Sequence, residues 1–193
     1  MMYSTNSYKV RPPYSIWYDD IVKMRKYVEE RCTEIKSKYQ KEKEDFLKTL
    51  DEKYYEGIDI GHAYCQHDDP SLEIWHNMNS DLIALEREIK STMEIILKKM
   101  IIHYNYLKDD ELKEMSIHGI MDTIAIKSKI DISKQKRNLK RIKSMIRNRN
   151  NSEHLIDVYQ REINIEYILS ILKSVNEYLI HILEGLYKKS KTN

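Results

Sequence analysis

Apolar residues recur at helical spacing through the first half of the chain. From about Trp17 to Leu50 they lie three, four or seven residues apart, which predicts one stripe on a long amphipathic helix. The members of this stripe are Ile21, Val28, Cys32, Ile35, Tyr39, Phe46 and Leu50. A second stripe, from Leu72 to about Leu107, consists of Leu82, Leu85, Ile89, Met93, Ile96 and Met100. The connection between them is short, so we expect the two helices to form an antiparallel pair.

Shorter patterns come after the predicted pair. Asp109-Asp110-Glu111 place acidic residues at the start of a short helix that contains Leu112 and Met115, and Gly119 is expected to end or bend it. The stretch 120–132 fits no single pattern.

Two further helices are predicted towards the carboxyl end. Ser133 is a candidate cap for a helix that contains Leu139, Ile142, Met145 and Ile146. We expect the polar run 147–152 to break that helix and Ser152 to cap the next one. The last stripe predicts a final helix through Ile168, Ile171, Val175, Tyr178, Ile182 and Leu186.

Composition agrees with an all-α fold. The 193 residues (23.3 kDa) include only 4 Gly and 3 Pro, too few for the turns of an all-β protein. The length suits one domain, so we expect 1–193 to form a single helical bundle built on the long antiparallel pair. Residues 1–16 are interpreted as an extended N-terminal segment.

Several protein classes are disfavoured by the sequence. The mean hydropathy is −0.68, and the longest apolar tract, 163–186, is interrupted by charged residues, so no membrane span is expected. The first 17 residues lack the unbroken apolar stretch of a signal peptide. Cys32 and Cys65 do not suggest a disulfide framework. We therefore expect a cytoplasmic protein.

Charge is distributed unevenly along the chain. Residues 127–149 contain ten basic residues and one acid, Asp131, which is a net +9 in a chain whose total is +2. The rest of the chain therefore carries −7. A cationic face on an acidic protein is typical of binding to phosphate-bearing polymers, although a solvated helix surface is the alternative. The candidate RNA-binding residues are Lys136, Arg137, Lys140, Arg141 and Lys143.

Candidate catalytic residues lie at the end of this basic run. Arg149 is followed directly by Asn150 and, after a gap of four residues, by His154, and Arg147 precedes the same histidine by seven. An arginine offers a planar pair of donors to a phosphate. If Ser152 begins a helix, its first turn favours an anion and a neutral imidazole. A neutral His154 can exchange a proton with a ribose 2′-hydroxyl without a metal, which selects RNA over DNA.

The Arg149-to-His154 motif resembles the signature of the HEPN superfamily (higher eukaryotes and prokaryotes nucleotide-binding), and 139–160 is the motif region. The resemblance implies a helical, metal-independent endoribonuclease or RNA-binding relative that needs no cofactor. It assigns acid–base catalysis to His154, phosphate binding to Arg149, orientation to Asn150 and assistance to Arg147. It also implies a homodimer or a HEPN-containing partner, and an antitoxin or regulatory protein of a toxin–antitoxin or antiviral defence system.

Other candidate sites and functions remain open. His62, Cys65, His67 and His76 have a spacing that could hold zinc, but no Cys-x-x-Cys supports a metal site and none is expected. The acidic clusters are interpreted as helix-capping residues. The alternative function is a non-enzymatic helical interaction or assembly protein, whose apolar stripes pack on a partner.

Overall fold

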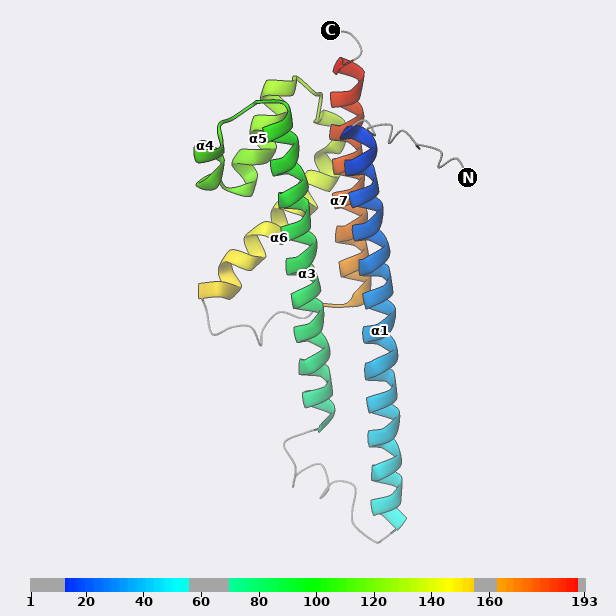
Figure 1. Cartoon of the computed structure of the whole chain (residues 1–193). Coiled ribbons are helices and arrows are strands. Elements are labelled where there is room, and N and C mark those ends of the chain that lie inside the picture. The colour runs from blue at the N-terminus through cyan, green and yellow to red at the C-terminus, as the bar shows by residue number, and fades with distance from the viewer. Residues whose placement is uncertain (1–12, 56–69, 155–162, 191–193) are drawn as a thin grey trace, which may run out of the picture. The chain divides into compact units, whose positions relative to one another are not determined.

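The protein is an all-α helical bundle, as its sequence predicts. The structure, a computed structural model, describes residues 13–55, 70–154 and 163–190. Within these ranges it contains six α-helices, one 3₁₀-helix and no strand (Figure 1). The elements are α1 (Pro13–Tyr55), α3 (Pro70–His103), α4 (Asp109–Lys113), α5 (Ile117–Ser128), η1 (Ser133–Gln135), α6 (Lys136–His154) and α7 (Ile165–Ser190).

The chain divides into two compact units. Unit 1 combines residues 1–25, 91–143 and 174–193, and unit 2 combines 26–90 and 144–173. The helices α1, α3, α6 and α7 each contribute residues to both units. Neither unit is therefore a continuous stretch of sequence, and the single domain stays a prediction.

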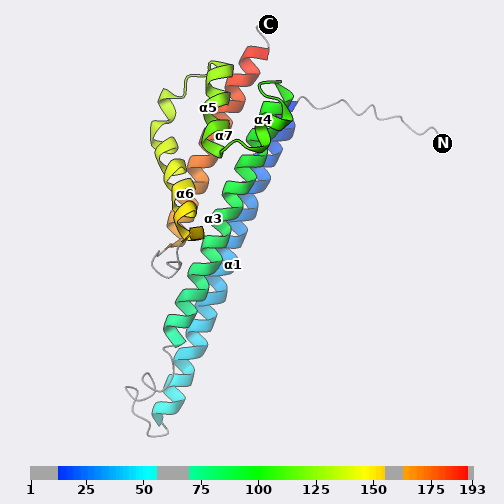
Figure 2. The same ribbon diagram turned by 90° about the vertical axis from the view of Figure 1, so that its left-hand side faces the viewer.

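The antiparallel pairing of α1 and α3 is confirmed by their side-chain contacts. In unit 1, Lys99 Nζ lies 3.3 Å from Asp20 Oδ2. In unit 2, the Tyr27 hydroxyl donates to Glu88 over 2.9 Å, and Lys38 Nζ lies 3.2 Å from Asp81 Oδ2. In unit 1, Trp17 contacts the His103 ring at 5.2 Å between ring centres, so in both units the contact later in α1 is made with a residue earlier in α3. Figures 1 and 2 show the two helices side by side.

The core of unit 1 is aliphatic, with methionines and two aromatic residues. Its buried members on α1 and α3 are Trp17, Ile21, Met24, Met93, Ile96, Leu97, Met100 and Ile101. Its buried members on the later helices are Leu112, Ile117, Ile120, Met121, Ile124, Ile142, Val175, Tyr178, Leu179, Ile182, Leu183 and Leu186. All six residues of the last predicted stripe are buried, four of them in unit 1 and two in unit 2, so the predicted spacing matches α7.

The core of unit 2 combines apolar packing with two buried polar contacts. Its apolar members are Val28, Cys32, Ile35, Tyr39, Leu82, Ile83, Leu85, Ile89, Met145, Ile146, Ile163, Ile168, Ile171 and Leu172. Buried Asn79 accepts the Ile163 N–H over 2.9 Å, and buried Glu86 accepts the Tyr167 hydroxyl over 2.8 Å. One bond joins α3 to the residues just before α7 and the other joins it to the first turn of α7, and both satisfy polar groups that would be costly to bury alone.

Two predictions about where helices begin and end are wrong. The helix α1 already begins at Pro13, so residues 13–16 belong to it rather than to an extended segment. Proline is favoured in a first helical turn, where its missing N–H costs nothing. Gly119 does not end a helix either, because it lies in the first turn of α5. There its N–H donates to the Ser116 hydroxyl over 3.2 Å, and Ser116 caps the helix.

The caps predicted for the last two helices also differ. Ser133 is the first residue of η1 and donates its own N–H to Asp131 Oδ1 over 2.8 Å. The helix α7 begins at Ile165, where Asn164 Oδ1 accepts the Tyr167 N–H over 2.8 Å. Asn164 is therefore the cap, and Ser152 lies inside α6 instead.

Candidate nucleic-acid interface

The basic helix α6 is held at its start by hydrogen bonds within unit 1. Asn138 donates to Gln135 Oε1 over 2.8 Å and to Glu177 Oε2 of α7 over 2.9 Å. In the preceding turn, hydrogen bonds from Ser133 lower the pKa of Asp131, so this carboxylate is charged at neutral pH. These contacts fix where the basic helix begins.

The two sides of α6 differ sharply. Ile142, Met145 and Ile146 are buried, which orients the helix by its apolar side. The opposite side carries Lys136, Lys140, Lys143 and Arg147, all exposed. These four recur at intervals of four, three and four residues, so they form one row about 16 Å long. We call these four residues the basic row.

The basic stretch 127–149 also contains cations that are not part of the basic row. Lys127, Lys129, Lys134 and Arg137 are exposed, and Arg141 is half-buried. None of the nine cations from Lys127 to Arg147 forms an ion pair with a carboxylate in the described part of the chain. Their charge is therefore available to an external polyanion.

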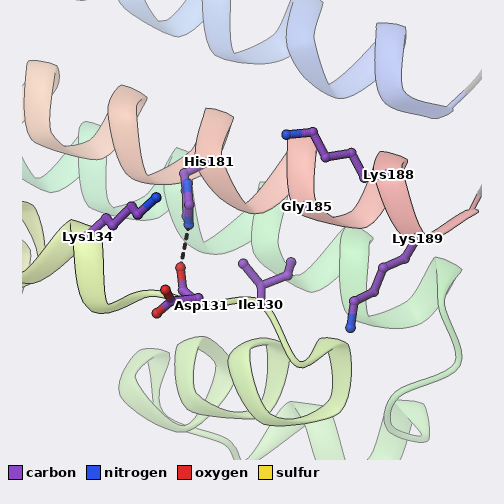
Figure 3. Close-up of a pocket in the computed structure, with 7 residues that line it drawn as sticks. All are labelled: Ile130, Asp131, Lys134, His181, Gly185, Lys188 and Lys189. Carbon is purple, nitrogen blue, oxygen red and sulfur yellow. Dashed lines mark hydrogen bonds between the residues drawn. The ribbon is translucent and has the colours of Figure 1, made fainter.

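A hollow of about 280 Å³ in unit 1 adds cations from α7 to this stretch. Lys134 lines it from η1, and His181, Lys188 and Lys189 line it from α7, as Figure 3 shows. His181 Nε2 donates to the backbone oxygen of Asp131 over 2.7 Å, and the Lys189 amine donates to the backbone oxygen of Ser128. The lining of this hollow thus contains three lysines and one carboxylate, so cations outnumber acids there.

The structure changes the predicted environment of the motif. Residues 147–152 do not break α6, which continues to His154. The run contains neither Gly nor Pro, and arginine is a good helix former, so its polarity alone does not stop the helix. The expected helix start at Ser152, with free N–H groups for an anion, is therefore wrong. The end of a helix instead presents unpaired carbonyl groups.

The helical register sorts the candidate catalytic positions into two groups. Positions 147, 150 and 154 continue the basic row at intervals of three and four residues. Position 149 lies about 140° around the helix from position 154, at 100° per residue. Register therefore brings Arg147 and Asn150, rather than Arg149, onto the helix face of His154. Of these residues, only the Arg147 side chain lies in the part that the structure describes, and it is exposed.

The remaining residues from the sequence analysis are Cys32 and the group His62, Cys65, His67 and His76. Burial raises the pKa of the Cys32 thiol, which makes it a poor nucleophile. No group of three or more His, Cys, Asp or Glu residues within the described ranges could hold a metal ion. His62, Cys65 and His67 lie outside the described residues, while the His76 ring contacts Trp75 at 4.9 Å between ring centres.

Sequence reasoning missed the part of the site that α7 supplies. His181 meets the backbone of Asp131 across a separation of 50 residues, and no local pattern reports such a contact. The adjacent Lys188 and Lys189 at the end of a helix were the only visible signal, and cations there are common because they favour the helix dipole.

No protein-family model, curated protein or solved structure matches the chain. Among the helices that the structure describes, none combines the length and the apolar character that crossing a membrane requires.

Proposed function

We propose that this protein binds RNA through the basic row of α6 and the cations beside it. The observation that supports the proposal is an exposed row of four cations without described ion-pair partners, on a helix oriented by a buried apolar face. Successive members lie about 4.5–6 Å apart along the helix axis, so several can contact one phosphate backbone at once. The hollow beside His181 extends the cationic surface in unit 1 onto α7.

A binding titration with labelled RNA tests this proposal. The triple variant Lys136→Glu/Lys140→Glu/Lys143→Glu should bind RNA at least about tenfold more weakly, because each lost phosphate contact removes counterion release and each new carboxylate repels the strand. The matched control reverses three exposed lysines of α1, Lys23, Lys26 and Lys41, and should retain wild-type affinity. An equal loss of RNA affinity in both variants would mean that net charge, rather than the basic row, determines binding.

Metal-independent RNA cleavage is a second candidate function. It is favoured by the register of α6, which continues the basic row through positions 147, 150 and 154. In this proposal His154 is the general acid or base, and Arg147 and Asn150 hold the scissile phosphate. Arg149, to which the HEPN resemblance assigns phosphate binding, occupies a position about 140° around the helix from position 154. It would reach a composite site only by facing a second motif in a homodimer or HEPN-containing partner.

The cleavage proposal has a direct test. The protein is incubated with RNA in the presence of a chelator, and the products are analysed for a 2′,3′-cyclic phosphate. His154→Ala should lower the rate about a hundred- to ten-thousand-fold while leaving RNA affinity unchanged. Arg149→Lys should be harmful only if a dimer forms, which the mass in solution reports independently.

A positive result would support the metal-independent ribonuclease that the resemblance implies, for which a toxin–antitoxin or antiviral defence role in the cytoplasm is the expectation. If the wild type neither binds nor cleaves RNA, the alternative of a non-enzymatic interaction protein takes its place.

A further inference from the structure

Two residues of α7 hold the segment that leads into the basic row. His181 Nε2 lies 2.7 Å from the backbone oxygen of Asp131, as the dashed line in Figure 3 shows. A carbonyl oxygen can only accept a hydrogen bond, so Nε2 carries the proton and donates it. One helical turn earlier on α7, Glu177 Oε2 accepts a hydrogen bond from Asn138 over 2.9 Å. The two bonds therefore hold both ends of the segment 131–138, which contains η1 and the first residues of α6.

Hydrogen bonds within this segment connect the two contacts. Asp131 Oδ1 accepts the Ser133 N–H over 2.8 Å, and the backbone oxygen of Ile132 accepts the Gln135 N–H over 2.9 Å. Gln135 Oε1 in turn accepts a hydrogen bond from Asn138 over 2.8 Å. The segment is thus bonded internally and is bonded to α7 at both ends.

The part of α7 that makes these contacts is packed into the core of unit 1. Tyr178 directly follows Glu177, and Ile182 directly follows His181; both have 0% of their surface exposed. Close packing of this kind fixes the position of a helix and of the side chains that leave it. His181 and Glu177 therefore hold the segment 131–138 against a fixed support.

The held segment carries two cations of the proposed RNA-binding surface. Lys134 lies in η1, and Lys136 is the first residue of both α6 and the basic row. Both side chains are exposed. Groups that are already in position before binding lose less conformational freedom when they bind, so the contacts with α7 favour a simultaneous contact of several cations with one phosphate backbone.

We propose that His181 and Glu177 are positioning residues for RNA binding, which hold 131–138 so that Lys134 and Lys136 contact the phosphate backbone together with the rest of the basic row. The proposal rests on RNA binding by the basic row. His181 acts through the backbone of Asp131, and Glu177 acts through Asn138. The carboxylate of Glu177 repels phosphate, so a favourable contribution of Glu177 to RNA binding distinguishes positioning from direct attraction.

Charge-matched variants of His181 test the proposal. His181→Gln keeps an N–H donor for the Asp131 backbone, whereas His181→Leu has none, and both new side chains are uncharged. Loss of one hydrogen bond changes a conformational equilibrium by about two- to tenfold. Because affinity falls with the fraction of molecules in the binding-competent conformation, His181→Leu should bind labelled RNA about two- to tenfold more weakly than His181→Gln.

The same design applies to Glu177. Glu177→Gln keeps an acceptor for Asn138, whereas Glu177→Leu has none, and both variants lose the same negative charge. Glu177→Gln should bind RNA at least as tightly as the wild type, because a charge that repels phosphate is removed. Glu177→Leu should bind RNA about two- to tenfold more weakly than Glu177→Gln.

Hydrogen exchange reports the position of the segment without RNA. The Gln135 amide, which donates to Ile132, should exchange faster in His181→Leu than in His181→Gln. The control is Ser116→Ala, which removes an uncharged side-chain hydrogen bond elsewhere in unit 1, from Gly119 N–H to the cap of α5. Ser116→Ala should leave both the exchange of the Gln135 amide and the RNA affinity unchanged.

Two results would overturn the proposal. The first is equal exchange of the Gln135 amide in His181→Leu and His181→Gln, which would mean that the bond to Asp131 does not hold the segment. The second is equal RNA affinity within either charge-matched pair. If RNA binding is lost in Lys136→Glu/Lys140→Glu/Lys143→Glu but is equal within the pairs, positioning fails while the proposed function stands; if the wild type binds no RNA, the proposed function itself fails.

Discussion

Gly185 of α7 permits the close contact that anchors the beginning of the basic run in unit 1. A Cβ atom at Gly185 would lie 2.7 Å from both Cδ1 and Cγ1 of Ile130, and 3.1 Å from Cγ2. Ordinary contacts between carbon atoms are about 3.5–4.0 Å. In Figure 3, Ile130 points from the connection after α5 towards Gly185. Alanine at position 185 therefore has to displace the whole Ile130 side chain.

The magnitude of Gly185→Ala depends on two opposing effects. Alanine inside a helix is favoured over glycine by about 1 kcal/mol. Overpacking against Ile130 costs about 1–3 kcal/mol. In an Ile130→Ala background the clash is absent, so the same substitution should stabilise the protein by about 1 kcal/mol. The double-mutant cycle should therefore give a coupling energy of about 1–3 kcal/mol.

Urea unfolding of the four proteins of this cycle, followed by circular dichroism, measures the coupling. Gly119→Ala is the control, because its Cβ would come too close only to the flexible side chain of Met115, with Cγ at 2.8 Å, while the Ser116 hydroxyl at 3.6 Å is an ordinary contact. It should be neutral or stabilising. If Gly185→Ala stabilises the wild type as much as the Ile130→Ala variant, the contact does not exist and the reasoning is refuted.

Four further substitutions probe individual polar groups. Asn164→Ala should lower the free energy of unfolding by about 1 kcal/mol in denaturant titrations, because α7 loses its cap; no change would contradict that role. Tyr39→Phe should lower the free energy of unfolding by about 1 kcal/mol, because the Tyr39 hydroxyl donates to Asp81 over 2.8 Å. Tyr178→Phe should leave the free energy of unfolding unchanged, since the buried Tyr178 hydroxyl has no hydrogen-bond partner among the described residues. Burial works to raise the pKa of Asp81, but hydrogen bonds from Tyr39 and Lys38 outweigh it and hold the pKa below its usual range. The bonded carboxylate therefore stabilises the protein above about pH 4 and loses this effect as the pH falls through its folded pKa. The free energy of unfolding of Asp81→Asn should therefore fall less steeply below about pH 4 than that of the wild type. Parallel curves of unfolding free energy against pH for the two proteins would contradict this.

The apolar stripes predicted most of the core, because spacing alone shows which face of a helix is apolar. Ile21, Val28 and Ile35 of the first stripe are buried as expected. Phe46 has the same spacing and is only half-buried. A stripe does not report which neighbour covers it, so spacing alone does not give the degree of burial.

The helix ends were harder to predict, because several residues could serve as the same cap. Ser152 and Asn164 both have side chains suited to capping the last helix. The structure uses Asn164, next to Ile163, whose N–H bonds to Asn79 across a separation of 84 residues. The local sequence allows either residue as the cap, and the residue that the structure uses lies beside this long-range contact.

The candidate interface was predictable only where it is contiguous in sequence. Charge counting found the basic run and its lysines on α6. It could not show that Arg147 and position 154 share a helix face while position 149 does not, because the expected break at 147–152 concealed the register. The contribution of His181 depended on a long-range contact.

The salt dependence of RNA binding tests the central claim most directly. The dissociation constant of labelled single-stranded RNA is measured over a range of salt concentrations for the wild type and for Lys136→Glu/Lys140→Glu/Lys143→Glu. Each phosphate contact contributes about 0.7 to the log–log slope, so loss of three lysines should make the slope shallower by about two. An unchanged slope and affinity in the variant, or no RNA binding by the wild type, would contradict the assignment of α6 as the RNA-binding element.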